Sequence, residues 1–183
     1  MKKGGFKNLV VYRLAVTIFD LTNTFCERFL NRLRFRRTVE QMEQAARSGK
    51  QNIVEGSLEK SMEGNIKLTG VARASYGELL EDYKDFLRRK GLSVWEKDDP
   101  RVLRIRALKE NLEKTTDLTN LSNWTNLDFR EAENFANLMI SLIYKQSYLL
   151  DQLLRSLEGK FVREGGFREN LFRKRREFLK KIC

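Results

Sequence analysis

Apolar residues recur at every third or fourth position through four long segments of the chain, and this spacing predicts amphipathic helices. The segments run from about Asn8 to Asn31, from about Phe35 to Glu55, from Ser61 to Lys90 and from about Phe129 to Leu157. Strand-type alternation is hard to find anywhere. Helices of this length bury their apolar faces against one another, so the sequence predicts an all-α, up-down four-helix bundle.

Small residues interrupt two of these helices. The second helix is thin at its middle, where it carries Ala45, Ala46, Ser48 and Gly49. Glycine inside a helix costs about 1 kcal/mol relative to alanine, so Gly49 indicates a close helix crossing. Gly70 and Gly77 lie near one face of the third helix and are expected to fit that thin middle. Gly56 suits a left-handed cap at the end of the second helix, as Gly91 does for the third.

Residues 92–127 differ from the rest and are expected to be a helical insertion before the last core helix. Pro100 favours the first turn of a short helix. The Thr-, Asn- and Ser-rich stretch Thr115–Asn126 is typical of a loop. Asp128, with Glu131 three residues later, resembles a capping box at the start of the fourth long helix.

A basic tail follows the bundle. Gly159 is expected to end the bundle at residue 158, and Gly165 with Gly166 to form a hinge. Residues 159–183 contain nine Lys and Arg against three Asp and Glu, and so carry a net +6 of the chain's +11. Apolar residues are interleaved with this charge, namely Phe167, Leu171, Phe172, Phe178 and Leu179. The tail therefore predicts a basic, amphipathic C-terminal helix.

Composition limits the chemistry. The chain has 183 residues, enough for one domain with a sizeable core. It contains no histidine, which removes His-based general acid–base catalysis and His-containing metal sites. Its two cysteines, Cys26 and Cys183, cannot form a structural zinc site or a disulfide framework. The net charge of +11 suggests an acidic partner, most simply a nucleic acid, and a merely solvated surface is an equal alternative.

Membrane and secretion signals are weak. The N-terminus begins Met-Lys-Lys and soon becomes apolar, but Arg13 and Asp20 interrupt the apolar run and no small-residue cleavage site follows. No stretch of about 18 uncharged apolar residues exists, so no membrane span is expected. These features predict a cytoplasmic protein.

Four short motifs occur in order along the predicted bundle: Gly5-Phe-Lys-Asn-Leu-Val-Val-Tyr12, Gln44-Ala-Ala46, Asn52-Ile-Val-Glu-Gly56 and Ala74-Ser-Tyr-Gly-Glu-Leu79. The first resembles G-F-x-x-L-x-V-(W/Y), and the last is similar to A-x-G-S-x-x-E-L with its small residues rearranged. Together they resemble the four-helix-bundle family encoded in intervening sequences of bacterial large-subunit ribosomal RNA genes. That family includes the accessory variability determinant of diversity-generating retroelements.

The resemblance covers residues 5–90 well and residues 129–157 weakly. It implies a homo-oligomer, a pentameric ring in the relatives, with basic surfaces, no catalytic site and no cofactor. It also implies association with nucleic acid and, in retroelements, with a reverse transcriptase. The insertion at 92–127 replaces the family's short link, and the tail extends beyond the common core, as in members with a C-terminal suffix.

Two basic groups are candidates for binding nucleic acid, whether RNA, DNA or a hybrid. One surrounds the turn between the second and third helices and comprises Arg47, Lys50, Lys60, Lys67 and Arg73. The other is in the tail and comprises Arg173, Lys174, Arg175, Arg176, Lys180 and Lys181. Basic residues bind phosphates while interleaved phenylalanines stack on bases. The alternatives are a solvated face for the first group and, for the tail, docking on the bundle, on a neighbouring subunit or on a membrane surface.

Glu55 and Glu78 are the carboxylates that an enzyme or a metal site would use. Such a site needs them close together and partly buried, with more acids gathered around them. The structural interpretation is favoured, in which Glu55 caps a helix end and Glu78 pairs with Arg47, Arg73 or an amide. The sequence thus predicts a non-catalytic, oligomeric nucleic-acid-binding accessory protein, without metal or cofactor, that assists a reverse transcriptase. The alternative is a structural adaptor whose basic tail binds an acidic protein.

Overall fold

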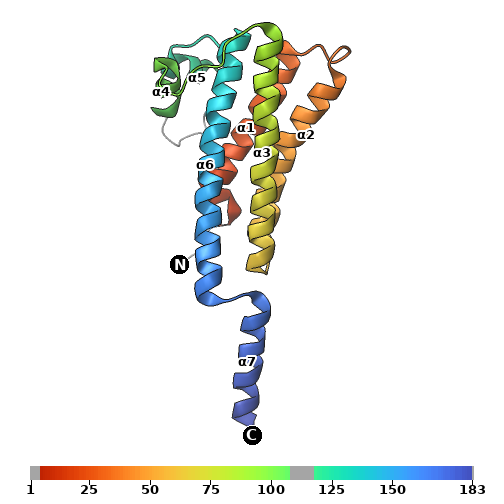
Figure 1. The fold of residues 1–183 in the computed structure, drawn as a ribbon, viewed down its shortest axis with the longest axis vertical. Helices are drawn as coiled ribbons and strands as arrows, with labels where there is room; N and C mark the ends of the chain where they lie inside the picture. The colour runs from red at the N-terminus through yellow and green to blue at the C-terminus, as the bar shows by residue number, and fades with distance from the viewer. Residues whose placement is uncertain (1–4, 108–117, 183) are drawn as a thin grey trace.

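The computed structural model describes residues 5–107 and 118–182, and within these ranges the regular structure is entirely helical. The prediction of an all-α fold is confirmed. The helices shown in Figure 1 are η1 (Phe6–Asn8), α1 (Val10–Phe29), α2 (Arg36–Leu58), α3 (Met62–Lys90), α4 (Pro100–Ala107), α5 (Leu118–Thr125), α6 (Ala132–Glu164) and α7 (Phe167–Ile182).

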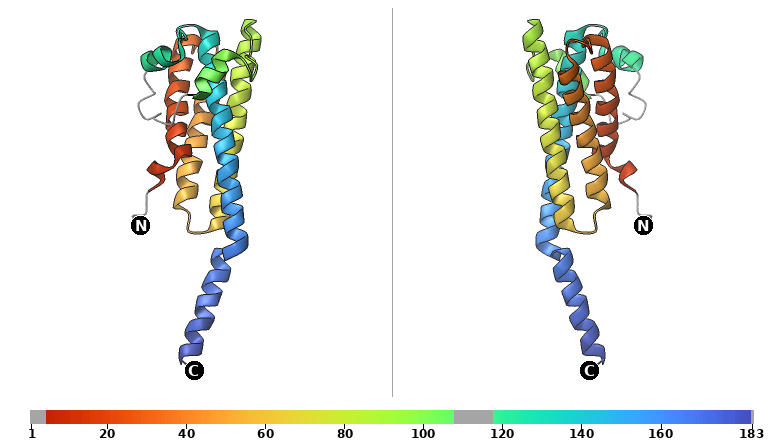
Figure 2. Two further views of the ribbon diagram at one scale, coloured as in Figure 1. Left: turned by 90° about the vertical axis from the view of Figure 1, so that its left-hand side faces the viewer. Right: turned by 90° about the vertical axis from the view of Figure 1, so that its right-hand side faces the viewer.

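The four long helices α1, α2, α3 and α6 form an up-down bundle. Each packs against the next in chain order, and α6 closes the bundle by packing against α1. The short helices α4 and α5 lie at the end of the bundle where α3 ends and α6 begins (Figure 1). Helix α7 leaves the opposite end of the bundle in both side views (Figure 2). The bundle, the helical insertion and the separate C-terminal helix are those that the sequence predicts.

An aromatic cluster fills the core where α1, α3 and α6 meet. Phe25 is fully buried, and its ring centroid lies 4.9 Å from those of Tyr83 and Phe86 and 5.5 Å from that of Phe135. These contacts are edge-to-face, the arrangement that the ring quadrupoles favour. The Tyr83 hydroxyl donates a hydrogen bond of 3.1 Å to Oγ1 of Thr22, so its polar tip is satisfied inside the core.

The close crossing of α2 and α3 depends on Gly49. A Cβ at this position would lie 2.6 Å from Cζ of Tyr76, whose ring rests against the glycine. Beside it, the hydroxyls of Ser48 and Ser75 form a hydrogen bond of 3.0 Å between the two helices. The predicted tight crossing is therefore present.

The prediction that Gly70 and Gly77 of α3 pack against Gly49 is wrong, however. A Cβ at Gly70 or Gly77 would meet nothing within 4 Å, so both glycines line the open side of α3 instead of its contact with α2. The sequence places them near one face but does not say which face is buried. The nearby Tyr76 occupies the position that they were expected to fill.

The predicted ends of α3 are confirmed, and both depend on contacts within one helical turn. Ser61 is the N-cap of α3 and accepts a hydrogen bond of 3.0 Å from the Gly64 N–H. Gly91 ends α3 with φ 66°, in the left-handed region. Gly56, in contrast, does not cap α2, because the helix continues through it to Leu58 with ordinary backbone angles.

The insertion is more helical than predicted. Helix α5 occupies residues 118–125 of the stretch expected to be a loop; residues 115–117 lie outside the described ranges. Leu121 is fully buried, and Thr125 donates a hydrogen bond of 2.7 Å to its carbonyl. Packing of Leu121 thus overrides the polar composition. Asp128 does not cap α6 either: it forms a bidentate ion pair with Arg130, and α6 begins later, at Ala132.

The fourth long helix is longer than predicted. Helix α6 passes through Gly159 without a break and ends at Gly165, which has φ 74°. The expectation that Gly159 ends the bundle is therefore wrong, and the separate C-terminal helix begins only at Phe167. One glycine costs a helix about 1 kcal/mol, which the surrounding helix formers offset, whereas Gly165 adopts a conformation that other residues avoid.

Candidate nucleic-acid interface

The start of α7 is held by its own capping contacts. The Gly166 N–H donates a hydrogen bond of 2.8 Å to Oε2 of Glu169, and Asn170 donates one of 3.2 Å to the Gly165 carbonyl. Gly166 is buried, because the Glu63 side chain of α3 and the Phe161 ring lie against it. A side chain at Gly166 would clash with Glu63. These contacts set where α7 leaves the bundle.

No residue of α7 is buried. Between residues 167 and 182 the helix carries seven Lys and Arg against two Glu, a net charge of +5. Its large apolar side chains are exposed to between 42% and 63%, although such side chains normally cover a core. This helix is thus the most basic exposed element of the described chain and also displays several unpacked aromatic rings.

The side chains of α7 divide between two faces, since successive residues turn by about 100°. One face, the outer basic face, carries Arg173, Arg176 and Lys180, together with both glutamates of the helix, Glu169 and Glu177. The opposite face, the mixed face, has apolar residues on both sides of Arg168 and Arg175, which lie seven residues apart. The apolar members of the mixed face are Phe167, Leu171, Phe172, Phe178, Leu179 and Ile182. Lys174 and Lys181 lie at the border between the faces.

The five basic residues near the α2–α3 turn do not share one face. The Lys50 ammonium lies 3.5 Å from the centroid of the Phe19 ring, in the seam between α1 and α2. Arg73 pairs with Asp151 at 3.1 Å, in the seam between α3 and α6. Both cations are thus occupied, on opposite sides of the bundle. The remaining three, Arg47, Lys60 and Lys67, are exposed.

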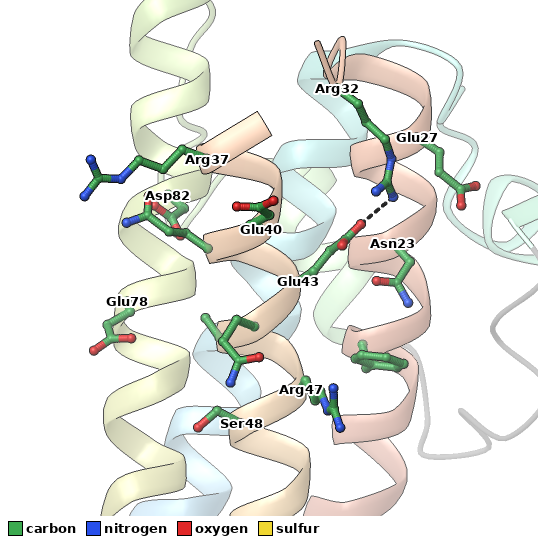
Figure 3. Close-up of a pocket in the computed structure, with 14 residues that line it drawn as sticks. Asn23, Glu27, Arg32, Arg37, Glu40, Glu43, Arg47, Ser48, Glu78 and Asp82 are labelled. Carbon is green, nitrogen blue, oxygen red and sulfur yellow. Dashed lines mark hydrogen bonds and ion pairs between the residues drawn. The ribbon is translucent and has the colours of Figure 1, made fainter. Parts of the chain in front are cut away.

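An acidic hollow of about 1200 Å³ lies over the half of α2 that is nearer the α1–α2 link (Figure 3). It is lined by five carboxylates and only three guanidinium groups, in a chain that carries +11 overall. The charged lining residues are Glu27, Arg32, Arg37, Glu40, Glu43, Arg47, Glu78 and Asp82. Within it, Arg32 and Glu43 form an ion pair of 2.6 Å.

Two carboxylates of α3 leave this hollow negatively charged. None of the ion pairs in the described part of the chain includes Glu78 or Asp82, and Arg73, an expected partner of Glu78, pairs with Asp151 instead. Burial, with the nearby Asp85 and Glu78 carboxylates, raises the pKa of Asp82 to about 6. The surroundings of Asp82 therefore disfavour its ionised form.

This pKa predicts a pH effect on stability. The folded chain holds the Asp82 proton more tightly than the unfolded chain, whose ordinary value is 3.8, so stability falls as pH rises from about 4 to about 6. We expect Asp82→Asn to reduce this fall, measured by urea denaturation at pH 4, 5, 6 and 7. Asp128→Asn is the control, because Arg130 lowers the pKa of Asp128 and its neutralisation removes stability above pH 4. An unchanged profile in Asp82→Asn would contradict the prediction.

The structure gives no sign of the alternative chemistry at Glu55 and Glu78. Both are exposed, and the described residues contain no group of three or more acids or cysteines able to hold a metal ion. Asn52 donates hydrogen bonds to the Ser48 carbonyl and hydroxyl, as a structural residue does. Cys26 is buried, and this burial raises the pKa of its thiol to about 12, so the thiolate needed for reaction is scarce at neutral pH.

Comparisons with known proteins add no identification. No protein-family model, curated protein or solved structure matches this chain. The family resemblance in the four sequence motifs therefore remains a hypothesis. Across residues 5–107 and 118–182, no helix combines the length and apolar character needed to cross a membrane.

Sequence reasoning found most of the basic residues of α7 but missed Arg168 and the acidic hollow. Arg168 stands alone in the sequence, and only its spacing of seven residues from Arg175 signals that both lie on one face. The hollow has no compact sequence signal, because its lining comes from α1, the link after it, α2 and α3.

Proposed function

We propose that this protein is a non-catalytic nucleic-acid-binding accessory protein that works as an oligomer and contacts its nucleic acid through α7. The observation that carries the proposal is a helix with net charge +5 and several aromatic side chains of which no residue is buried. Within the described part of the chain, no other element combines these properties.

The outer basic face of α7 suits phosphate groups. Arg173, Arg176 and Lys180 present two guanidinium forks and one ammonium to solvent, and Arg forks bind phosphate oxygens in pairs. Such contacts release counterions from the nucleic acid, so binding weakens steeply with salt and depends little on sequence. The exposed rings of Phe172 and Phe178 supply stacking surfaces for unpaired bases. We therefore favour single-stranded RNA or DNA, or the strand ends of a hybrid.

The protein partner follows from the sequence resemblance. An accessory protein that holds template or product strands serves an enzyme such as a retroelement reverse transcriptase. We propose this partner class, together with a ring-forming homo-oligomer, on the four motifs described above. Near the α2–α3 turn, the exposed Lys60 and Lys67 contribute secondary contacts, whereas Arg47 lies at the middle of α2 and lines the acidic hollow.

A structural adaptor is the second candidate, and the mixed face of α7 favours it. Apolar side chains around Arg168 and Arg175 fit a protein surface with acidic groups in an apolar setting better than they fit a phosphate backbone. The two candidates use different charged residues of one helix, the outer basic face for nucleic acid and Arg168 with Arg175 for an acidic protein, so substitutions of the charged residues on a single face separate them.

Neutralising the outer basic face tests the nucleic-acid proposal. We expect the triple variant Arg173→Gln, Arg176→Gln and Lys180→Gln to weaken single-strand binding by about 100-fold at low salt. The slope of log affinity against log salt should become shallower by about 0.7 to 0.9 for each phosphate that the variant no longer neutralises. Fluorescence anisotropy with labelled RNA, DNA and hybrid oligonucleotides over a salt series measures both quantities.

A matched control makes the same charge change away from α7. The residues Arg28, Arg89 and Arg104 are exposed and lie on α1, α3 and α4, so their replacement by glutamine should change affinity far less. Equal losses in the two triple variants would mean that only net charge matters. Absence of salt-dependent binding by the wild-type chain at low ionic strength would overturn the proposal.

A further inference from the structure

The mixed face of α7 has no cover within its own chain. Leu171, Phe178 and Ile182 are about half exposed or more, and Arg168 and Arg175 lie between them and the second apolar row, Phe172 and Leu179. An apolar helix face left in water indicates a missing partner. The two arginines further specify that this partner carries carboxylates within or beside an apolar surface.

The chain itself contains a surface of that chemistry, the acidic hollow. Glu78 and Asp82 of α3 take part in none of the ion pairs of the described residues, and Glu40 of α2 stands beside them, paired only with the exposed Arg36 (Figure 3). Phe19 and Ala45 add apolar lining. With five carboxylates against three guanidinium groups, the hollow is thus complementary in charge to the two arginines of the mixed face, and its apolar lining is confined to Phe19 and Ala45.

These complementary surfaces lie at opposite ends of one molecule. The hollow begins at Arg32, beside the α1–α2 link, whereas α7 leaves the other end of the bundle next to the α2–α3 turn (Figures 1 and 3). Helix α6 runs without a break to Glu164, and Gly166 is buried against Glu63 at the start of α3. Helix α7 therefore points away from the hollow of its own chain.

We propose that α7 of one copy docks by its mixed face into the acidic hollow of a second copy. Arg168 and Arg175 are separated by about 10 Å along their helix. Glu78 and Asp82 lie one turn apart on α3, with Glu40 across the hollow on α2, so two guanidinium groups can meet separate carboxylates. The apolar rows on either side of the arginines then cover the apolar lining and lose their exposure to water.

This contact is head-to-tail, because each copy contacts one neighbour through the mixed face of its α7 and another through its acidic hollow. Such contacts continue from copy to copy and produce a closed ring or an open filament, according to the rotation between neighbours. The outer basic face of every α7 remains outside the contact and can bind phosphates, whereas a docked α7 no longer offers Phe172 and Phe178 for base stacking. The inference rests on the oligomer part of the proposed function and names its contact, but it requires no nucleic acid.

Charge reversal on each surface tests the docking. The tail variant carries Arg168→Glu and Arg175→Glu, and the hollow variant carries Glu40→Lys and Glu78→Lys; all four positions are exposed, so both variants should fold. The matched control, Arg173→Glu with Arg176→Glu, makes the same charge change on the outer basic face. Sedimentation velocity of the full, nucleic-acid-free chain measures association, and circular dichroism checks folding.

We expect the wild-type chain and the control to form concentration-dependent oligomers. In the tail and hollow variants the dissociation constant should rise by at least about 30-fold. The decisive sample is the mixture: the hollow variant's intact α7 fits the tail variant's intact hollow, and the reversed charges of the other two surfaces are also complementary, so mixing the two variants should restore association that neither shows alone. A monomeric wild-type chain, continued assembly of both variants, or a mixture that stays monomeric would each overturn the proposal. Failure of oligonucleotide binding alone would leave it standing.

Discussion

Replacing Phe25 with alanine is expected to lower the free energy of unfolding by about 4 kcal/mol, within the range measured for large aromatic truncations in cores. The Phe25 side chain is fully buried, and its ring contacts those of Tyr83, Phe86 and Phe135. Truncation removes the transfer free energy of the ring and leaves a cavity among rigid aromatic neighbours. Domains are stable by only about 5–15 kcal/mol, so this loss is a large share of the total.

Urea denaturation followed by circular dichroism measures the effect at Phe25. The control is Phe178→Ala, which removes the same atoms from a side chain that is 63% exposed on α7. This control should change stability by no more than about 0.5 kcal/mol. A loss for Phe25→Ala that is no larger than for Phe178→Ala would show that the aromatic cluster does not hold α1, α3 and α6 together.

The second large effect is expected at Gly49, where valine should destabilise the bundle by about 3 kcal/mol. Even the first added carbon would lie 2.6 Å from the Tyr76 ring, which is itself fully buried and cannot move aside. The helix propensity of valine exceeds that of glycine by only a few tenths of a kcal/mol, too little to offset the clash. The α2–α3 crossing must therefore widen.

Gly77 provides the matched control for Gly49. It is also a helical glycine of the bundle, but an added Cβ there would meet nothing within 4 Å. Gly77→Val should therefore leave stability unchanged or raise it slightly, in the same urea experiment. If both valine variants lose equal stability, the cost arises from the helix backbone and not from contact with Tyr76.

Several features of the fold could be predicted because local chemistry decides them. The hydroxyl of Ser61 satisfies a free N–H at the start of α3, and Gly91 adopts the left-handed conformation that ends it. Both effects act within one helical turn. The apolar spacing likewise predicts the four long helices, since burial of one face is the main force on an amphipathic helix.

Other features were misjudged because the local signal does not decide them. Gly159 resembles a helix end, yet α6 continues through it to Gly165. The polar stretch before Leu127 resembles a loop, yet burial of Leu121 stabilises α5. Gly70 and Gly77 resemble contact residues for α2, yet they face open space. The cost of Gly159, about 1 kcal/mol, is offset by the helix formers around it, and the polar composition of α5 is outweighed by the burial of Leu121.

The candidate nucleic-acid interface could likewise be predicted only in part. The run of basic residues from Arg173 to Arg176 is a contiguous segment, so its charge was visible in the sequence. Whether that segment docks on its own bundle is a tertiary question, and the exposure of all of α7 answers it. In the sequence, Lys50 and Arg73 could not be told apart from exposed basic residues such as Lys60. In the structure, Lys50 lies over the Phe19 ring and Arg73 forms an ion pair with Asp151.

By itself, the sequence determined the helical class, the bundle and the excess positive charge in the tail, because periodicity and net charge are properties of segments. Only the tertiary structure decided which glycine receives a neighbouring ring, which cations stay free and where carboxylates gather. Those outcomes depend on side chains that are distant in the chain and adjacent in space. The separation of the acidic hollow from α7 is of this kind, since it depends on the end of the bundle from which α7 leaves.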